Sequence, residues 1–144
     1  MSSTLDFPMQ IMGAEQPIWL RQAAKAAISR DGAYLLIMEY HSDGTPFWTL
    51  PGGGIREDES LKEGLRREIR EEIDCQVVIG DPTETVWYAH TTRERTVSAY
   101  NVFECSISSE PKPNAEEDIV DYRWIRPDEF PTRTIPQIRY LFGR

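Results

Sequence analysis

Residues 50–75 read LPGGGIREDESLKEGLRREIREEIDC, and this stretch carries the strongest structural signal in the chain. Apolar residues recur at every fourth position from Leu61 to Ile73, which is the stripe of an amphipathic helix. We expect this helix to end at Asp74. Gly64 lies on or beside the stripe, where glycine costs about 1 kcal/mol relative to alanine. We therefore expect Gly64 to mark a close contact between the helix and a sheet.

The segments around this helix are rich in β-forming and apolar residues, with turn residues between them. The predicted strands cover residues 21–29, 33–40, 47–50, 76–79, 85–90, 96–107 and 120–125. The first two form a hairpin, residues 51–54 are predicted to be irregular, and residues 55–59 are a charged loop. A helical turn at 128–130 and a helix over 135–142 end the chain. This order predicts an α/β (α+β) sandwich around a mixed β-sheet.

The composition limits the class of protein. The 144 residues include 16 Lys and Arg against 24 Asp and Glu, for a formal net charge of −8, and 40% are hydrophobic. This length suits a single domain over residues 1–144, with residues 1–16 as an N-terminal arm or short edge element. The acidity argues against nucleic acid as a partner. We see neither a membrane span nor a secretory signal, so we expect a cytoplasmic protein without a membrane partner.

Three glutamates on the predicted helix point to a metal. Glu68, Glu71 and Glu72 stand at i, i+3 and i+4, which places all three carboxylates on one side of the helix. Their mutual repulsion would be relieved by a hard divalent cation, which prefers oxygen ligands. The alternative is a solvated helix face on which neighbouring arginines form salt bridges with the glutamates. The helix by itself leaves both interpretations open.

The wider stretch closely resembles the signature of the Nudix (MutT-like) hydrolase family. Its fixed positions, at the family spacing, are Gly53, Glu59, Arg67, Glu68, Glu71 and Glu72. The resemblance extends from about Ala23 to Phe130 and implies the Nudix α/β/α sandwich. Two positions depart from the signature. Asp74 replaces a glycine that caps the helix in a left-handed conformation, which Asp tolerates better than most residues. Cys75 occupies a position for a bulky apolar residue.

The resemblance also implies roles for these residues. Glu68, Glu71 and Glu72, together with the carbonyl of Gly52, would bind Mg²⁺ or Mn²⁺. Glu59 would pair with Arg67 and thereby orient the metal-binding glutamates.

The general base is less closely defined by the resemblance. Glu68 is the first candidate for the base. Asp118, with Glu117 beside it, is a second candidate on the loop before the last strand. An ordinary acidic loop would explain both of these loop residues equally well.

The implied reaction is metal-dependent hydrolysis of a phosphoanhydride bond in a nucleoside diphosphate linked to another group. The partner is then a small nucleotide, and both a monomer and a homodimer remain open. The alternatives are a non-catalytic Nudix-fold module that binds or senses a nucleotide, and a diphosphate isomerase on the same scaffold. The complete glutamate set disfavours both. Trp87, Tyr88, His90 and Arg93 are candidates for substrate contacts, although residues such as the first two are more often part of a core.

Overall fold

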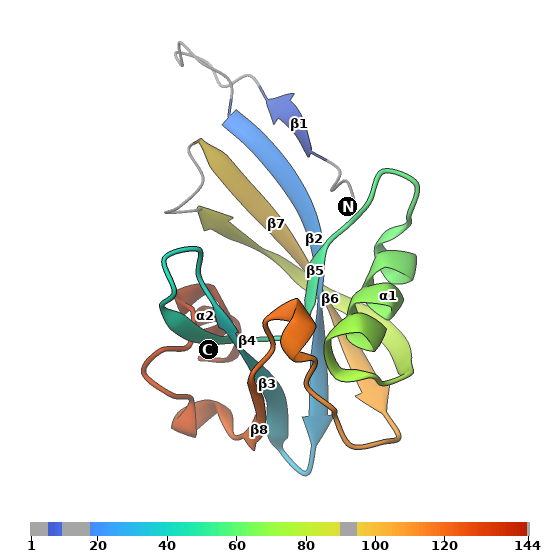
Figure 1. Cartoon of the computed structure of the whole chain (residues 1–144), viewed down its shortest axis with the longest axis vertical. Coiled ribbons are helices and arrows are strands. Elements are labelled where there is room, and N and C mark those ends of the chain that lie inside the picture. The colour runs from blue at the N-terminus through green and yellow to red at the C-terminus, as the bar shows by residue number, and fades with distance from the viewer. Residues whose placement is uncertain (1–5, 10–17, 90–94, 144) are drawn as a thin grey trace.

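The computed structural model describes residues 6–9, 18–89 and 95–143 (Figure 1). In these ranges the strands are β1 (Asp6–Met9), β2 (Ile18–Arg30), β3 (Ala33–Tyr40), β4 (Pro46–Thr49), β5 (Gly52–Gly54), β6 (Val77–Ala89), β7 (Thr96–Ile107) and β8 (Asp121–Ile125). The α-helices are α1 (Leu61–Ile73) and α2 (Pro136–Phe142), and the 3₁₀ turns are η1 (Ala115–Glu117) and η2 (Pro127–Glu129). The predicted helices and the mixed α/β class are confirmed.

The sheet is mixed, as the sequence predicts. Its central order is β4-β3-β2-β7-β6, and β1 and β5 also pair with β2 while β8 pairs with β3. The β2–β7 pair is parallel and the other strand pairs are antiparallel. In the described residues, β2 and β3 pair through two residues of each strand at the predicted hairpin. Beyond that point the two strands diverge, which leaves room between them for a site.

The two faces of the sheet pack into two separate cores. The stripe of α1, with Leu65 and Ile69 fully buried, packs against one face through residues such as Ile28. The other core contains Leu36 and the α2 residue Ile138. Helices α1 and α2 accordingly lie on opposite sides of the strands in Figure 1. This arrangement is the α/β/α sandwich that the resemblance implies.

The prediction that residues 51–54 are irregular is wrong for the glycines, because Gly52–Gly54 form β5 and pair with Ala23, Ala24 and Lys25 of β2. Gly52 has φ +130°, and a Cβ atom there would lie 2.1 Å from the carbonyl oxygen of Ala24. Only glycine allows this approach. Glycine has a low strand propensity because it lacks a side chain. Here the absence of a Cβ atom is what allows β5 to approach β2.

Two further expectations need correction. Residues 77–89 form one strand, β6, in place of the two predicted strands, with register shifts on both sides of Pro82. The bulges absorb the proline, which cannot donate a ladder hydrogen bond. Gly64 contacts the loop before the helix and not a sheet, because a Cβ atom there would lie 2.5 Å from Cδ1 of Ile55 and 3.1 Å from Oε1 of Glu59.

Asp74 adopts the left-handed conformation that the sequence predicts for the end of α1. Its φ and ψ are 54° and 44°, and its backbone N–H donates to the carbonyl of Arg70. We therefore expect Asp74→Gly to raise the free energy of unfolding by about 0.5–1 kcal/mol and to leave kcat unchanged. Chemical denaturation and steady-state kinetics measure the two quantities. A large change in kcat would place Asp74 in the functional site.

In the part of the chain that the structure describes, no helix combines the length and the apolar composition needed to cross a membrane.

Candidate active site

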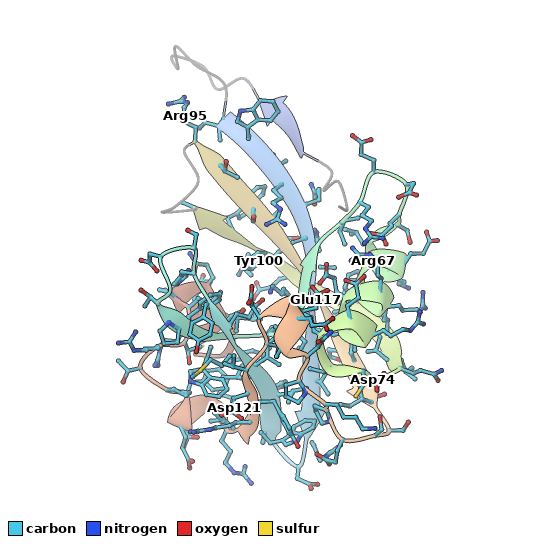
Figure 2. The ribbon with its side chains drawn as sticks, viewed as in Figure 1. Arg67, Asp74, Arg95, Tyr100, Glu117 and Asp121 are labelled. Atoms are coloured by element: carbon cyan, nitrogen blue, oxygen red, sulfur yellow. The ribbon has the colours of Figure 1, made fainter. Side chains whose placement is uncertain are left out.

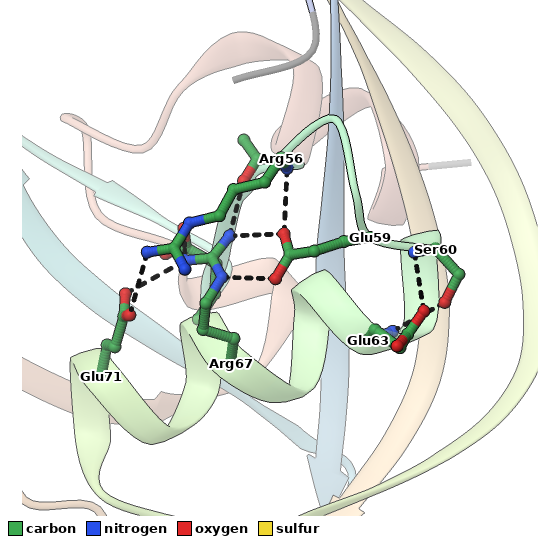
Figure 3. A network of polar contacts seen from close by, with 8 residues as sticks. Arg56, Glu59, Ser60, Glu63, Arg67 and Glu71 are labelled. Atoms are coloured by element: carbon green, nitrogen blue, oxygen red, sulfur yellow. Dashed lines mark hydrogen bonds and ion pairs between the residues drawn. The ribbon is translucent and has the colours of Figure 1, made fainter. Parts of the chain in front are cut away.

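The charged loop before α1 is tied to the helix by one arginine (Figure 3). Arg67 donates from Nε and Nη2 to the two carboxylate oxygens of Glu59, at 2.6 and 2.9 Å, and from Nη2 to the carbonyl of Gly54 at 3.1 Å. These bonds, together with the backbone N–H of Arg56, hold the pKa of Glu59 below its usual range. The Glu59–Arg67 pair implied by the resemblance is therefore present, and it fixes the glycine strand relative to α1.

The start of α1 is fixed separately by Ser60. Its hydroxyl accepts from the backbone N–H of Glu63, whose carboxylate accepts from the N–H of Ser60. This capping box holds the first turn of the helix that carries the glutamates.

The three helix glutamates do not point to one place. Glu71 accepts from Nη1 of Arg67 at 3.1 Å and lies 3.6 Å from Nη2 of Arg56. Glu68 also accepts from Nη1 of Arg67, at 3.0 Å, but it lines a cavity together with Glu72. The alternative of arginine salt bridges is thus correct for Glu71, whereas Glu72 is 4% exposed and belongs to the interior.

The cavity opens where β2 and β3 diverge and has a volume of about 470 Å³. Strands β2, β3, β4, β5 and β7 contribute to its wall together with α1 and η1. Four carboxylates line it, namely Glu39, Glu68, Glu72 and Glu117. Its size lies within the usual range for small-molecule sites.

The glycine strand brings its backbone against two of these carboxylates. The N–H of Gly52 donates to Oε1 of Glu72 at 2.8 Å. A Cβ atom on Gly53 would lie 2.8 Å from Cδ of Glu68. Burial raises the pKa of both Glu68 and Glu72, and the charge of Glu39 raises that of Glu72 further. The cavity therefore holds carboxylates that lack their normal hydration.

Sequence reasoning missed Lys25, a buried lysine beside these carboxylates. It is 4% exposed, and its Nζ donates to the carbonyls of Leu50 at 3.2 Å and Gly52 at 3.3 Å. Its Nζ also lies 5.1 Å from the ring centroid of Tyr100. Burial lowers the pKa of Lys25, but the carboxylates, with Glu39 foremost, outweigh burial and raise it overall. An isolated lysine in an apolar strand carries no sequence signal for this placement.

Glu39 was missed for a similar reason, since it stands alone near the end of an apolar strand. Burial raises its pKa, and the charge of Lys25 opposes that rise. On the loop before β8, Glu117 lines the cavity and Asp118 does not, although the charge of Asp118 also raises the pKa of Glu39. Figure 2 shows Glu117 on the η1 segment close to α1.

Asn114 helps to hold this loop against α1, together with the backbone N–H of Lys112, which donates to the carbonyl of Ile73 at 2.8 Å. The backbone N–H of Asn114 donates to the carbonyl of Glu72 at 2.9 Å, and its Nδ2 donates to the carbonyl of Glu71 at 2.9 Å. These bonds satisfy carbonyls at the end of the helix and place η1 at the cavity.

Of the residues predicted to contact substrate, Trp87 does not line this cavity. Trp87 is 55% exposed and lines a different hollow, between β6 and α2, with residues such as Pro136 and Tyr140. His90 and Arg93 lie outside the described residues, and the structure gives no description of the Tyr88 side chain.

The donor chemistry of the cavity fits a hard divalent cation. Glu68, Glu72 and the carbonyl of Gly52 all supply oxygen, and the crowded carboxylates would gain from a positive charge. Among the described residues, however, no three acidic, histidine or cysteine side chains already surround one position. Glu71 would have to exchange its arginine contacts to join such a site.

The comparisons with known proteins agree with this geometry. A family model described as NUDIX domain matches residues 19–142. Two proteins named nucleoside triphosphatase NudI are similar to this chain, each at 34% identity. The match to the Salmonella arizonae protein covers 72% of this chain and 79% of that protein. The match to the Escherichia coli protein covers 71% of this chain and 79% of that protein. A solved MutT protein from Methanosarcina mazei Go1 is 26% identical, with a TM-score of 0.76 over 87% of this chain and 91% of its own.

Proposed function

Because the chain belongs to the Nudix hydrolase family, we propose that it hydrolyses a phosphoanhydride bond in a nucleoside diphosphate linked to another group, with Mg²⁺ or Mn²⁺ as cofactor. The observation that carries the proposal is the cavity in which Glu68 and Glu72 lie against the glycine strand. The names of the NudI relatives favour nucleoside triphosphates, in which the linked group is a phosphate, as the first substrates to test.

The cation would be held by Glu68, Glu71, Glu72 and the carbonyl of Gly52. When bound, it polarises bridging phosphate oxygens, acidifies a water molecule and neutralises charge on the leaving oxygen. The Gly52 carbonyl already accepts from Lys25, so its second lone pair would serve the cation. These assignments follow the family resemblance and the oxygen chemistry of the cavity.

The chain's own side chains would carry out the remaining tasks. Glu68 would accept the proton of the attacking water, since it lines the cavity in which the phosphates would lie. The water oxygen bonds to phosphorus as the phosphoanhydride bond breaks, and the leaving phosphate takes the electron pair. Arg67 and Glu59 would keep Glu68 in position without contacting the substrate.

The test is hydrolysis of a panel of nucleoside triphosphates, followed by release of phosphate or pyrophosphate, and of other nucleoside diphosphate derivatives, followed by formation of the nucleoside monophosphate. We expect turnover with Mg²⁺ or Mn²⁺, its loss in EDTA, and its return when the cation is added back in excess. Full activity in EDTA, or the absence of turnover over the whole panel, would contradict the proposal.

The loop carboxylates give a separate prediction about the base. If Asp118 supplies a ligand or the base, Asp118→Asn should lower kcat and Glu117→Gln should be milder. If the residue that lines the cavity supplies the ligand or the base, Glu117→Gln should lower kcat more than Asp118→Asn, because Glu117 lines the cavity and Asp118 does not. Steady-state kinetics of the two variants distinguish these outcomes. Normal rates for both would return the base to the helix, with Glu68 as the first candidate.

A further inference from the structure

Part of the wall of the cavity is aromatic. His41 follows β3 and Phe47 lies on β4, and both line the same cavity as Glu68 and Glu72. Their rings are stacked, with centroids 4.1 Å apart and an interplanar angle of 20°. Both side chains are half-buried, and Phe47 also packs against the core that contains Leu36. The two rings therefore form an aromatic part of the cavity wall that the second core supports from behind.

The strand register explains why these rings face the cavity. Phe47 is the cross-strand partner of Glu39, so their side chains lie on the same face of the β3–β4 pair. His41 stands two residues after Glu39, where an extended chain returns to that face. Because Glu39 lines the cavity, the register directs all three side chains to it.

The hairpin loop holds the stacked pair in place. The N–H of His41 donates to the carbonyl of Thr45 at 2.8 Å, and the N–H of Gly44 donates to the carbonyl of His41 at 2.9 Å. Oδ1 of Asp43 accepts from the N–H of Thr45 at 2.9 Å, and Gly44 has φ +87°. These bonds fix the backbone from which the His41 ring projects. The aromatic surface is thus built by the fold before a ligand arrives.

We propose that His41 and Phe47 form the surface on which the base of the nucleotide substrate stacks, with the phosphates directed to Glu68 and Glu72. The assignment rests on the proposed function, because it takes a nucleotide as the ligand. Aromatic side chains stack on bases of every kind, since each base has a π-face. The cavity places this surface and the carboxylates in one space large enough for a nucleotide.

The test separates the base from the phosphates. Binding is measured by isothermal titration calorimetry, with Mg²⁺ present, for α,β-imido analogues of the four common deoxynucleoside triphosphates and for inorganic tripolyphosphate. Phe47→Ala and His41→Ala should weaken binding of the tightest analogue about 10-fold. Binding of tripolyphosphate should change less than about 2-fold, because it has no base to stack.

Two conservative variants and one control variant test whether the loss of affinity comes from the missing ring. Phe47→Tyr and His41→Phe keep a ring at each position and should restore nucleotide affinity. Trp87→Ala removes an exposed aromatic side chain from the other hollow and should leave both affinities unchanged.

Three outcomes would overturn the inference. Unchanged nucleotide affinity in both alanine variants would place the base elsewhere. An equal loss for nucleotide and tripolyphosphate would show that the hairpin shapes the phosphate end only. A wild-type protein that binds neither ligand would overturn the inference, whereas the proposed function fails only if the turnover assay over the wider panel also shows no activity.

Discussion

Glu72→Gln and Glu68→Gln should each lower kcat by about 100-fold or more with a confirmed nucleotide substrate. Both residues line the cavity, and each substitution removes a negative oxygen donor while keeping the shape of the side chain. Loss of the base in Glu68→Gln would act in the same direction. Kinetics at saturating Mg²⁺ and Mn²⁺ measure the effect. Wild-type rates in both variants would refute the assignment of the site.

The control for this prediction is Glu57→Gln, which makes the same chemical change in the exposed loop before α1 and should leave kcat unchanged. Folding of the Glu72→Gln protein is expected to survive, because the glutamine oxygen can still accept from the N–H of Gly52. A melting curve checks this, so that loss of the fold is not mistaken for loss of catalysis.

The pKa of Glu72 also gives the sign of a stability effect. Burial raises its pKa in the folded protein, so the folded state binds the proton more tightly than the unfolded state. The favourable contribution of Glu72 to the free energy of unfolding is complete at a pH below the pKa that Glu72 has in the unfolded chain. This contribution is lost as the pH rises through the raised pKa of Glu72 in the folded protein. In EDTA, Glu72→Gln should therefore gain thermal stability relative to wild type as the pH increases. A variant that gains stability and loses kcat is typical of a substitution that removes a charge needed for function.

The sequence predicts α1 well because its information is local. The four-residue apolar period and the left-handed Asp74 both depend on neighbours along the chain. The Glu59–Arg67 pair is also close in sequence, and the family resemblance supplied it. The strand β5 was missed because its stability comes from pairing with β2, which local propensity cannot reveal.

The cavity could not be predicted in the same way. It depends on the divergence of β2 from β3, which brings Lys25 and Glu39 to the helix glutamates from distant positions. The i, i+3, i+4 spacing predicts one shared side of α1 for Glu68, Glu71 and Glu72, and helix arginines such as Arg67 as the alternative partners. It could not show that Glu71 also turns to Arg56 while Glu68 and Glu72 line the cavity, because Arg56 lies on a loop with no periodic pattern.

Lys25→Met should destabilise the metal-free protein by about 3 kcal/mol, because it removes the buried positive charge that lies among Glu39, Glu68 and Glu72. The carbonyls of Leu50 and Gly52 would also lose their donor. Urea denaturation in EDTA measures the change in the free energy of unfolding. Lys62→Met, on the exposed face of α1, is the matched control and should change that free energy by less than about 0.5 kcal/mol.

The same variant tests whether Lys25 serves the electrostatics of the site or only its packing. If its charge offsets Glu39, Glu68 and Glu72, a divalent cation bound among these carboxylates should replace part of what is lost. Saturating Mn²⁺ should then stabilise Lys25→Met more than wild type, because it adds charge where the variant lacks it. Equal Mn²⁺ stabilisation of both proteins would instead show that Lys25 matters through its hydrogen bonds to the β4–β5 segment.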